Sequence, residues 1–165
     1  MKKWGILLSV LAVVLLQGQF LAAEEDIQKH PTCKYCGMDR QMFALSRMLV
    51  EYEDGPAVGV CSIHCAAVAL VMNADKMPKA IRVGDFNSKE LIDADKAFWV
   101  VGGSKPGVMT QRAKWAFQKQ KDAEKFRADY GGEPANFDQA MKASFEDIYS
   151  GLKMMWEKRR KMMEQ

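Results

Sequence analysis

The chain has 165 residues, enough for one domain or two small halves with a shared core, and this length excludes a large multidomain enzyme. Its 48% hydrophobic and 27% charged residues are typical of a globular protein, and they argue against a disordered, collagen-like or multi-span membrane chain. The net charge is +3, and without Lys2 and Lys3 the chain has 22 basic against 21 acidic residues. No basic excess remains for binding nucleic acid, which we exclude as a partner.

The N-terminus is typical of a secretory signal. Lys2 and Lys3 precede an apolar run, residues 5–16, that is short for a membrane span, and Ala22 and Ala23 offer a cleavage point. We therefore predict that residues 1–23 are removed and that the functional part lies outside the cytoplasm, in the periplasm. The alternative, a retained N-terminal membrane anchor, stays open. No cysteine ends the apolar run, so the sequence lacks a lipidation signal.

All four cysteines lie close together in the sequence, as Cys33 and Cys36 in CKYC and Cys61 and Cys65 in CSIHC, with His64 beside the last. Two tight pairs with an embedded histidine match metal-knuckle spacing, and in a secreted chain they match a disulfide framework as well. The pattern leaves a metal site and disulfides as alternatives.

Two strands and a helix are predicted around the second cysteine pair. Residues 42–53 alternate imperfectly, a Gly-Pro turn follows, and residues 57–60 form a short strand that ends before Cys61. A buried helix begins after Ser62, its predicted N-cap, and holds Cys65 in its first turn, where the helix dipole favours a thiolate.

A similar set without cysteines follows. Residues 80–86 and 97–101 are predicted strands, a helix is predicted from about Gln111 to the Gly131-Gly132 stop, and residues 136–165 form one long amphipathic helix. We predict an α+β fold of two small strand-strand-helix halves that share a core, with a long C-terminal helix. The expected segments are the signal, residues 1–23, a metal-binding domain, residues 24–135, and a helical extension, residues 136–165.

Three chemistries are compatible with the cysteine pairs. A structural or metal-sensing zinc site would use four cysteines, or three with His64. A thiol-disulfide oxidoreductase needs a CxxC at a helix start, whereas CKYC precedes Gly37 and a strand-like run. A copper(I) site uses soft ligands, and Met38, two residues after Cys36, supplies a thioether, which is a good ligand for copper(I) and a poor one for zinc. Copper(I) is therefore favoured over zinc.

The segments CKYCGM (33–38), FWVVGG (98–103), Gly107-Val108-Met109 and the Tyr130-Gly131-Gly132 helix end together resemble the NosL family, accessory proteins of nitrous oxide reductase. The resemblance implies an extracytoplasmic copper(I) chaperone with two related α+β halves, which delivers copper to nitrous oxide reductase, with a membrane maturation complex as a further partner. It places copper on Cys36 and Met38 and makes Met109 a further candidate. The family's usual lipobox cysteine is absent, which leaves membrane attachment open.

The CSIHC element is not part of the family's minimal pattern. Cys61, His64 and Cys65 are expected to bind the same ion as Cys33 and Cys36 or to hold a second one; a structural disulfide of Cys61 and Cys65 stays as the alternative. His30 lies three residues before Cys33 and is a weak ligand candidate. No nucleophile elbow, phosphate loop or dinucleotide fingerprint is present, so we expect no enzymatic activity.

Overall fold

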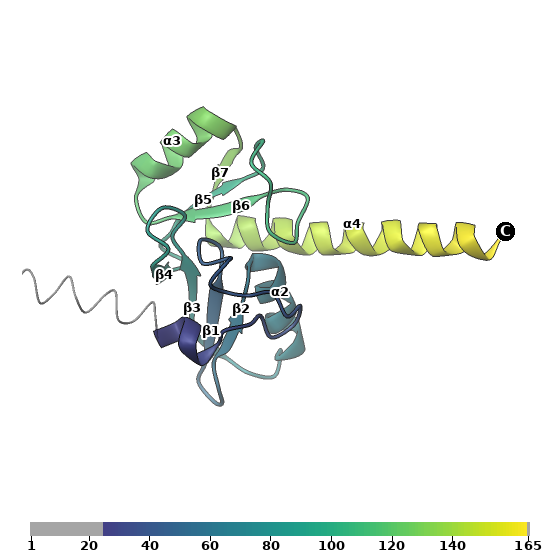
Figure 1. Ribbon diagram of the computed structural model, residues 1–165, viewed down its shortest axis with the longest axis horizontal. Helices are drawn as coiled ribbons and strands as arrows, with labels where there is room; N and C mark the ends of the chain where they lie inside the picture. Colours follow the sequence, from purple (N-terminus) through teal and green to yellow (C-terminus); the bar gives the residue numbers. More distant parts are fainter. Residues whose placement is uncertain (1–24, 165) are drawn as a thin grey trace, which may run out of the picture.

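The computed structural model describes residues 25–164. The predicted signal, residues 1–23, lies outside this range. The described residues form a body of two small sheets with helices, from which one long helix extends (Figure 1). Within residues 25–164, no helix is both long enough and apolar enough to cross a membrane.

The first sheet is antiparallel, with strand order β2-β1-β3-β4. Its central strand β1 has the burial alternation expected when one face of a sheet packs on a core. Helix α2 follows β2 directly and packs against both β1 and β2. The bounds are β1 (Met48–Tyr52), β2 (Val58–Val60), β3 (Pro78–Gly84), β4 (Leu91–Asp93) and α2 (Ile63–Met72).

The second sheet is also antiparallel, with strand order β6-β5-β7, and helix α3 packs against β5 and β6. Its edge strand β7 contains Pro134, which an edge tolerates because no second neighbour needs its missing N–H. Helix α3 ends at Gly131, whose φ of 76° is costly for other residues, so the predicted Gly-Gly stop is confirmed. The bounds are β5 (Phe98–Val101), β6 (Lys114–Phe117), α3 (Gln120–Tyr130) and β7 (Glu133–Ala135).

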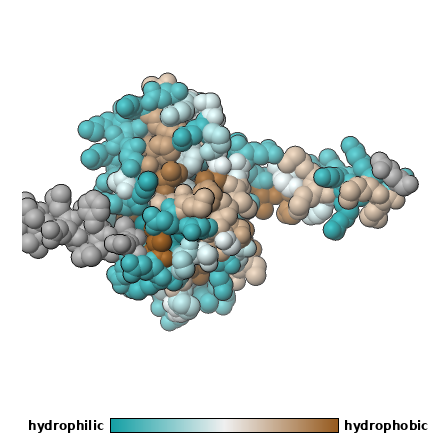
Figure 2. All heavy atoms as spheres, in the orientation of Figure 1, coloured by the Kyte–Doolittle hydropathy of each residue, from teal (hydrophilic) through white to brown (hydrophobic). Residues whose placement is uncertain are grey.

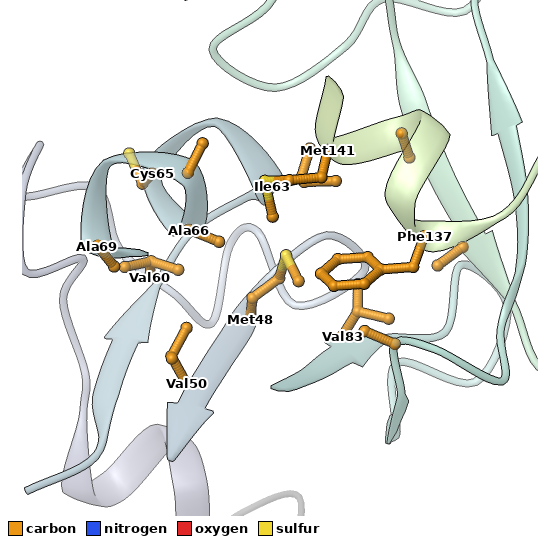
Figure 3. Packing of buried hydrophobic residues seen from close by; sticks show 14 of the residues in the cluster. Met48, Val50, Val60, Ile63, Cys65, Ala66, Ala69, Val83, Phe137 and Met141 are labelled. Atoms are coloured by element: carbon orange, nitrogen blue, oxygen red, sulfur yellow. The ribbon is translucent and has the colours of Figure 1, made fainter. Parts of the chain in front are cut away.

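The long C-terminal helix is confirmed as α4 (Phe137–Met163). Its first turns pack against α2 and β5, and its remainder extends away from the body to the C-terminus (Figure 1). Phe137 and Met141 of α4 pack with Met48 and Val83 of the first sheet (Figure 3), and the same core includes Trp99 of the second sheet. The two halves therefore share a core, as predicted for this α+β fold.

Two predicted elements differ from the structure. The strand expected at residues 42–53 is confined to Met48–Tyr52, because residues 40–46 form turns in which the Asp39 carboxylate accepts hydrogen bonds from the N–H groups of Gln41 and Met42, at 2.7 and 2.9 Å. Met42, the first residue of the expected strand, is 77% exposed.

The helix expected from Gln111 begins at Gln120 instead. The stretch before it contains β6, which pairs with β5. All four residues of β6 are buried, so its sequence lacks the alternation of apolar and polar residues that would identify a strand. As a result the second strand-strand-helix half is β5-β6-α3. The predicted strand at residues 80–86 corresponds to β3 (Pro78–Gly84) and belongs to the first sheet.

Candidate metal centre

The first two cysteines lie in a tight loop formed by residues 33–38. The N–H of Cys33 donates to the carbonyl of Met38 at 2.8 Å, and the N–H of Gly37 donates to the carbonyl of Cys33 at 3.0 Å. Gly37 has a φ of 74°, which the turn requires and which glycine adopts without strain. The N–H of Lys34 donates to the carbonyl of Gly59 at 3.1 Å, so the loop is fastened to β2.

The second pair lies at the junction between β2 and α2. Cys61 follows the last residue of β2, and Cys65 lies in the first turn of α2, as predicted. The Sγ atom of Cys61 lies 3.5 Å from that of Cys36 and 3.8 Å from that of Cys65, and all four Sγ atoms lie within 4.8 Å of one another. The fold therefore brings the two sequence pairs together as one cluster of four thiols, none of which is in a disulfide.

The thioether of Met38 adjoins this cluster. Its Sδ atom lies 4.0 Å from the Sγ atom of Cys61, and the side chain is half-buried. Cys33, Cys61 and Cys65 are buried, whereas Cys36 is exposed. Three thiols of the cluster are thus shielded from solvent, and the Cys36 thiol is accessible to it.

The pKa values of Cys36, Cys61 and Cys65 are shifted in different directions. Hydrogen bonding from the Cys65 thiol lowers the pKa of Cys61 to about 6, against the effect of burial, with further hydrogen bonds from Cys36 and Ser62. Desolvation raises the pKa of Cys36 to about 11, and its hydrogen bonds to Cys33 and Cys61 add to this effect. Hydrogen bonding to Cys61, followed by burial, raises the pKa of Cys65 well above its usual range. Of Cys36, Cys61 and Cys65, the thiol that loses its proton most readily is therefore Cys61, one residue before the N-cap of α2, and not Cys65, where the dipole argument favoured a thiolate.

Four sulfurs at this spacing match the requirements of one soft metal ion. Sulfurs bound to a tetrahedral zinc ion at about 2.3 Å lie about 3.8 Å apart, close to the shorter separations in the cluster. Copper(I) accepts the same thiolates in lower coordination and also accepts the Met38 thioether. The buried Cys61 thiolate supplies negative charge that a cation would neutralise. Because CKYC lies in a turn and does not begin a helix, it lacks the feature that activates redox CxxC motifs.

The remaining predicted ligands lie elsewhere in the described structure. Neither His30 nor His64 contributes to the group of four. His64, at the start of α2, lines a separate cleft together with Met109, beside α4. Desolvation, followed by the positive charge of Lys114, lowers the pKa of His64, so its imidazole is neutral at pH 7. The structure thus groups Cys33, Cys36, Met38, Cys61 and Cys65, and it groups His64 with Met109 at a second place.

A buried ion network holds the strand that leads to Cys61. The sequence pattern gave no indication of this network. Asp26 bonds Arg40 at 3.0 Å and Arg47 at 2.8 Å, and all three side chains are almost fully buried. Arg40 also donates to the carbonyl of Val60 at 3.1 Å and to that of Met48 at 3.0 Å. This network fixes the end of β2, and with it the position of Cys61, relative to β1.

Comparisons with known proteins agree with this geometry. The crystal structure of the copper chaperone NosL from Shewanella denitrificans matches with a TM-score of 0.51 and 24% identity, over 65% of this chain and 87% of that chain, a likeness that shows the fold. A search of curated proteins gave no match. The family model NosL matches residues 24–145, which cover both sheets, the thiol cluster and the packed start of α4. The chain therefore belongs to the NosL family.

Proposed function

We propose that this protein is a copper(I) chaperone that carries one ion on the thiol cluster and Met38. The observation that carries the proposal is the convergence of four thiols within 4.8 Å, with a thioether 4.0 Å from the thiolate of Cys61. Membership of the NosL family and likeness in fold to a copper chaperone support the choice of ion. In this proposal copper is a cargo and the protein performs no chemical reaction on it.

Release to a recipient follows from the unequal exposure of the ligands. Cys36 is exposed and Met38 is half-buried, so a thiol or thioether from a partner can replace them one at a time while Cys33, Cys61 and Cys65 still hold the ion. A site closed on all sides would exchange its metal slowly. The recipient that the family resemblance favours is nitrous oxide reductase, outside the cytoplasm, where the N-terminal signal or anchor would place this chain.

Zinc is the second candidate, because the shorter sulfur separations of 3.5 and 3.8 Å match a tetrahedral four-thiolate site. In that case the cluster would stabilise the fold, or sense zinc, and Met38 would have no role in binding. The two candidates therefore differ in what they require of the thioether.

The test is a metal competition titration of the reduced full chain without oxygen, using chromophoric chelators for copper(I) and for zinc. We expect one copper(I) to bind tightly at the cluster, with an affinity about tenfold or more lower in Met38→Leu and lower still in Cys36→Ser. Met42→Leu is the matched control, because Met42 lies four residues away and is 77% exposed. Tight zinc binding, with copper(I) binding indifferent to Met38→Leu, would contradict the copper proposal and support zinc.

A further inference from the structure

Helix α4 continues beyond the core, and its outer part extends away from the body (Figure 1). We call residues 146–163 the α4 arm. The arm lies outside residues 24–145, which match the family model, and every residue from 153 to 163 is exposed. Figure 2 shows hydrophobic as well as hydrophilic side chains on it. Exposed apolar side chains mark a binding surface where they form a contiguous patch.

Four apolar side chains of the arm form a stripe along one side of the helix. They are Tyr149, Leu152, Trp156 and Met163, at intervals of three, four and seven residues. Tyr149 is 59% exposed, Trp156 53% and Met163 79%. At about 100° per residue, the centre of the stripe lies about 110° around the helix from Ser144, which is fully buried against the body. The stripe is therefore turned away from the core.

Basic side chains border the stripe on both sides. Arg159 lies about 20° beyond Leu152 on one side, and Arg160 lies about 20° beyond Tyr149 on the other. Residues 153–163 include five lysines and arginines and one acidic residue, which leaves a local excess of four positive charges. The outer arm thus combines an apolar stripe with a strongly basic border.

A second copy of the chain is a poor partner for this stripe because of its charge. Two parallel arms would place their basic ends side by side. Two antiparallel arms would place each basic end beside Glu146 and Asp147 of the other, but both carboxylates are already bound within the chain. Arg112 lies 2.9 Å from Glu146 and 2.7 Å from Asp147, and Lys114 lies 2.7 Å from Asp147.

An anionic lipid surface suits both parts of the pattern. Tryptophan and tyrosine favour the boundary between headgroups and acyl chains, and arginine and lysine reach the phosphates while their stems stay in apolar surroundings. We propose that the α4 arm docks this protein on an anionic lipid bilayer, with the stripe against the acyl chains and Arg159 and Arg160 at the phosphates. No helix within residues 25–164 can cross a membrane, so the arm lies along the surface.

The test is an NMR experiment on the reduced full chain, labelled with ¹³C in its methionine methyl groups. Lipid nanodiscs of phosphatidylcholine and phosphatidylglycerol, with a nitroxide on the acyl chain of one lipid, are added stepwise. We expect the Met163 signal to broaden strongly and the Met154 signal several-fold less, because these two residues lie on opposite sides of the helix. Nanodiscs of phosphatidylcholine alone should broaden the Met163 signal much less.

A substitution in the stripe tests the apolar contact. The lipid concentration that gives half of the Met163 broadening should rise about tenfold or more in Trp156→Ala, which removes apolar area from the contact. Met154→Ala is the matched control, at 49% exposure against 53% for Trp156, and should change this concentration little. Every variant retains residues 1–23, so any lipid binding by that segment is common to all of them.

A pair of charge reversals tests the basic border. Arg160→Glu and Lys161→Glu change the net charge equally at neighbouring positions, but Lys161 points about 150° away from the centre of the stripe. Arg160→Glu should therefore raise the half-broadening lipid concentration several-fold more than Lys161→Glu. Copper(I) binding at the thiol cluster should be the same in all of these variants.

The outcomes separate this inference from the proposed function. Equal broadening of Met154 and Met163, or equal effects of the two charge reversals, overturns the docking surface. Shifts of the Met163 signal that depend on protein concentration without lipid would show that a second copy covers the stripe, which also overturns it. No broadening at all, with copper(I) binding intact, overturns the docking surface and leaves the chaperone proposal standing.

Discussion

At the scale of single residues, Asp147 joins the loop before β6 to α4. Desolvation raises its pKa, but hydrogen bonds from Lys114, Thr110 and Arg112 outweigh this effect and lower the pKa to about 2. A carboxylate with a depressed pKa stabilises the folded state above its unfolded value of about 4, and this contribution is lost as the pH falls from 4 through 2. The lowered pKa corresponds to about 2 kcal/mol at neutral pH.

We therefore expect Asp147→Asn to lower the free energy of unfolding by about 2 kcal/mol or more at pH 7, because it also leaves the buried Lys114 without its anion. The difference from the wild type should shrink below pH 4 and vanish only below pH 2. Urea unfolding across this pH range measures it. Glu146→Gln is the control, since Glu146 is 52% exposed and its bond to Arg112 contributes little. A pH-independent difference would contradict the assignment.

The cysteines show how far single residues could be predicted. Spacing predicted that each pair, Cys33 with Cys36 and Cys61 with Cys65, could bind a metal ion, but it left open whether the two pairs share one site, which the structure shows that they do. The position of His64 could not be predicted, since neighbouring residues in a helix turn point in directions about 100° apart. The network of Asp26, Arg40 and Arg47 had no signal at all, because buried ion pairs between distant residues follow no local pattern.

At the scale of elements, the start of α4 has a complete capping box. The Asn136 side chain accepts a hydrogen bond from the N–H of Gln139, and the Gln139 side chain accepts one from the N–H of Asn136, both at 2.9 Å. Asn136→Ala is expected to lower the free energy of unfolding by about 1 kcal/mol. Asn136→Ser should keep most of the wild-type stability, because serine also caps a helix. Urea denaturation monitored by circular dichroism measures both variants. Equal stability of the Ala and Ser variants would show that the cap contributes nothing.

Elements with a local signal were predicted well, including strands β2, β3 and β5, whereas strands that only their pairing reveals were not. Helix α4 has an N-cap and a long apolar stripe, and α3 ends at two glycines, so the end of α3 and the start of α4 followed from the sequence. Strands β4, β6 and β7 are three or four residues long and were missed. Strand β6 has no alternation because both of its faces are buried, and its partner β5 is what makes it a strand.

At the scale of the whole molecule, the two sheets are joined by one core and not by a linker. Phe137, at the first position of α4, lies in the cluster that includes Met48 and Val83 of the first sheet, and its ring lies 5.8 Å from that of Trp99 in the second. A shared core was predicted from the short length of each half. The assignment of β3 to the first sheet was not predicted, because it depends on long-range pairing with β1.

Because the start of α4 packs in one cluster with side chains of both sheets, the protein should unfold in one cooperative step. Phe137→Ala removes a ring that is only 7% exposed and should lower the free energy of unfolding by about 3–5 kcal/mol. Phe145→Ala, two turns further along the same helix at 39% exposure, is the matched control and should cost much less. Tryptophan fluorescence, which reports mainly on Trp99 and Trp115 of the second sheet, should give the same urea midpoint as circular dichroism in every variant. Separate midpoints for the two probes would mean that the halves fold independently and that Phe137 stabilises only one of them.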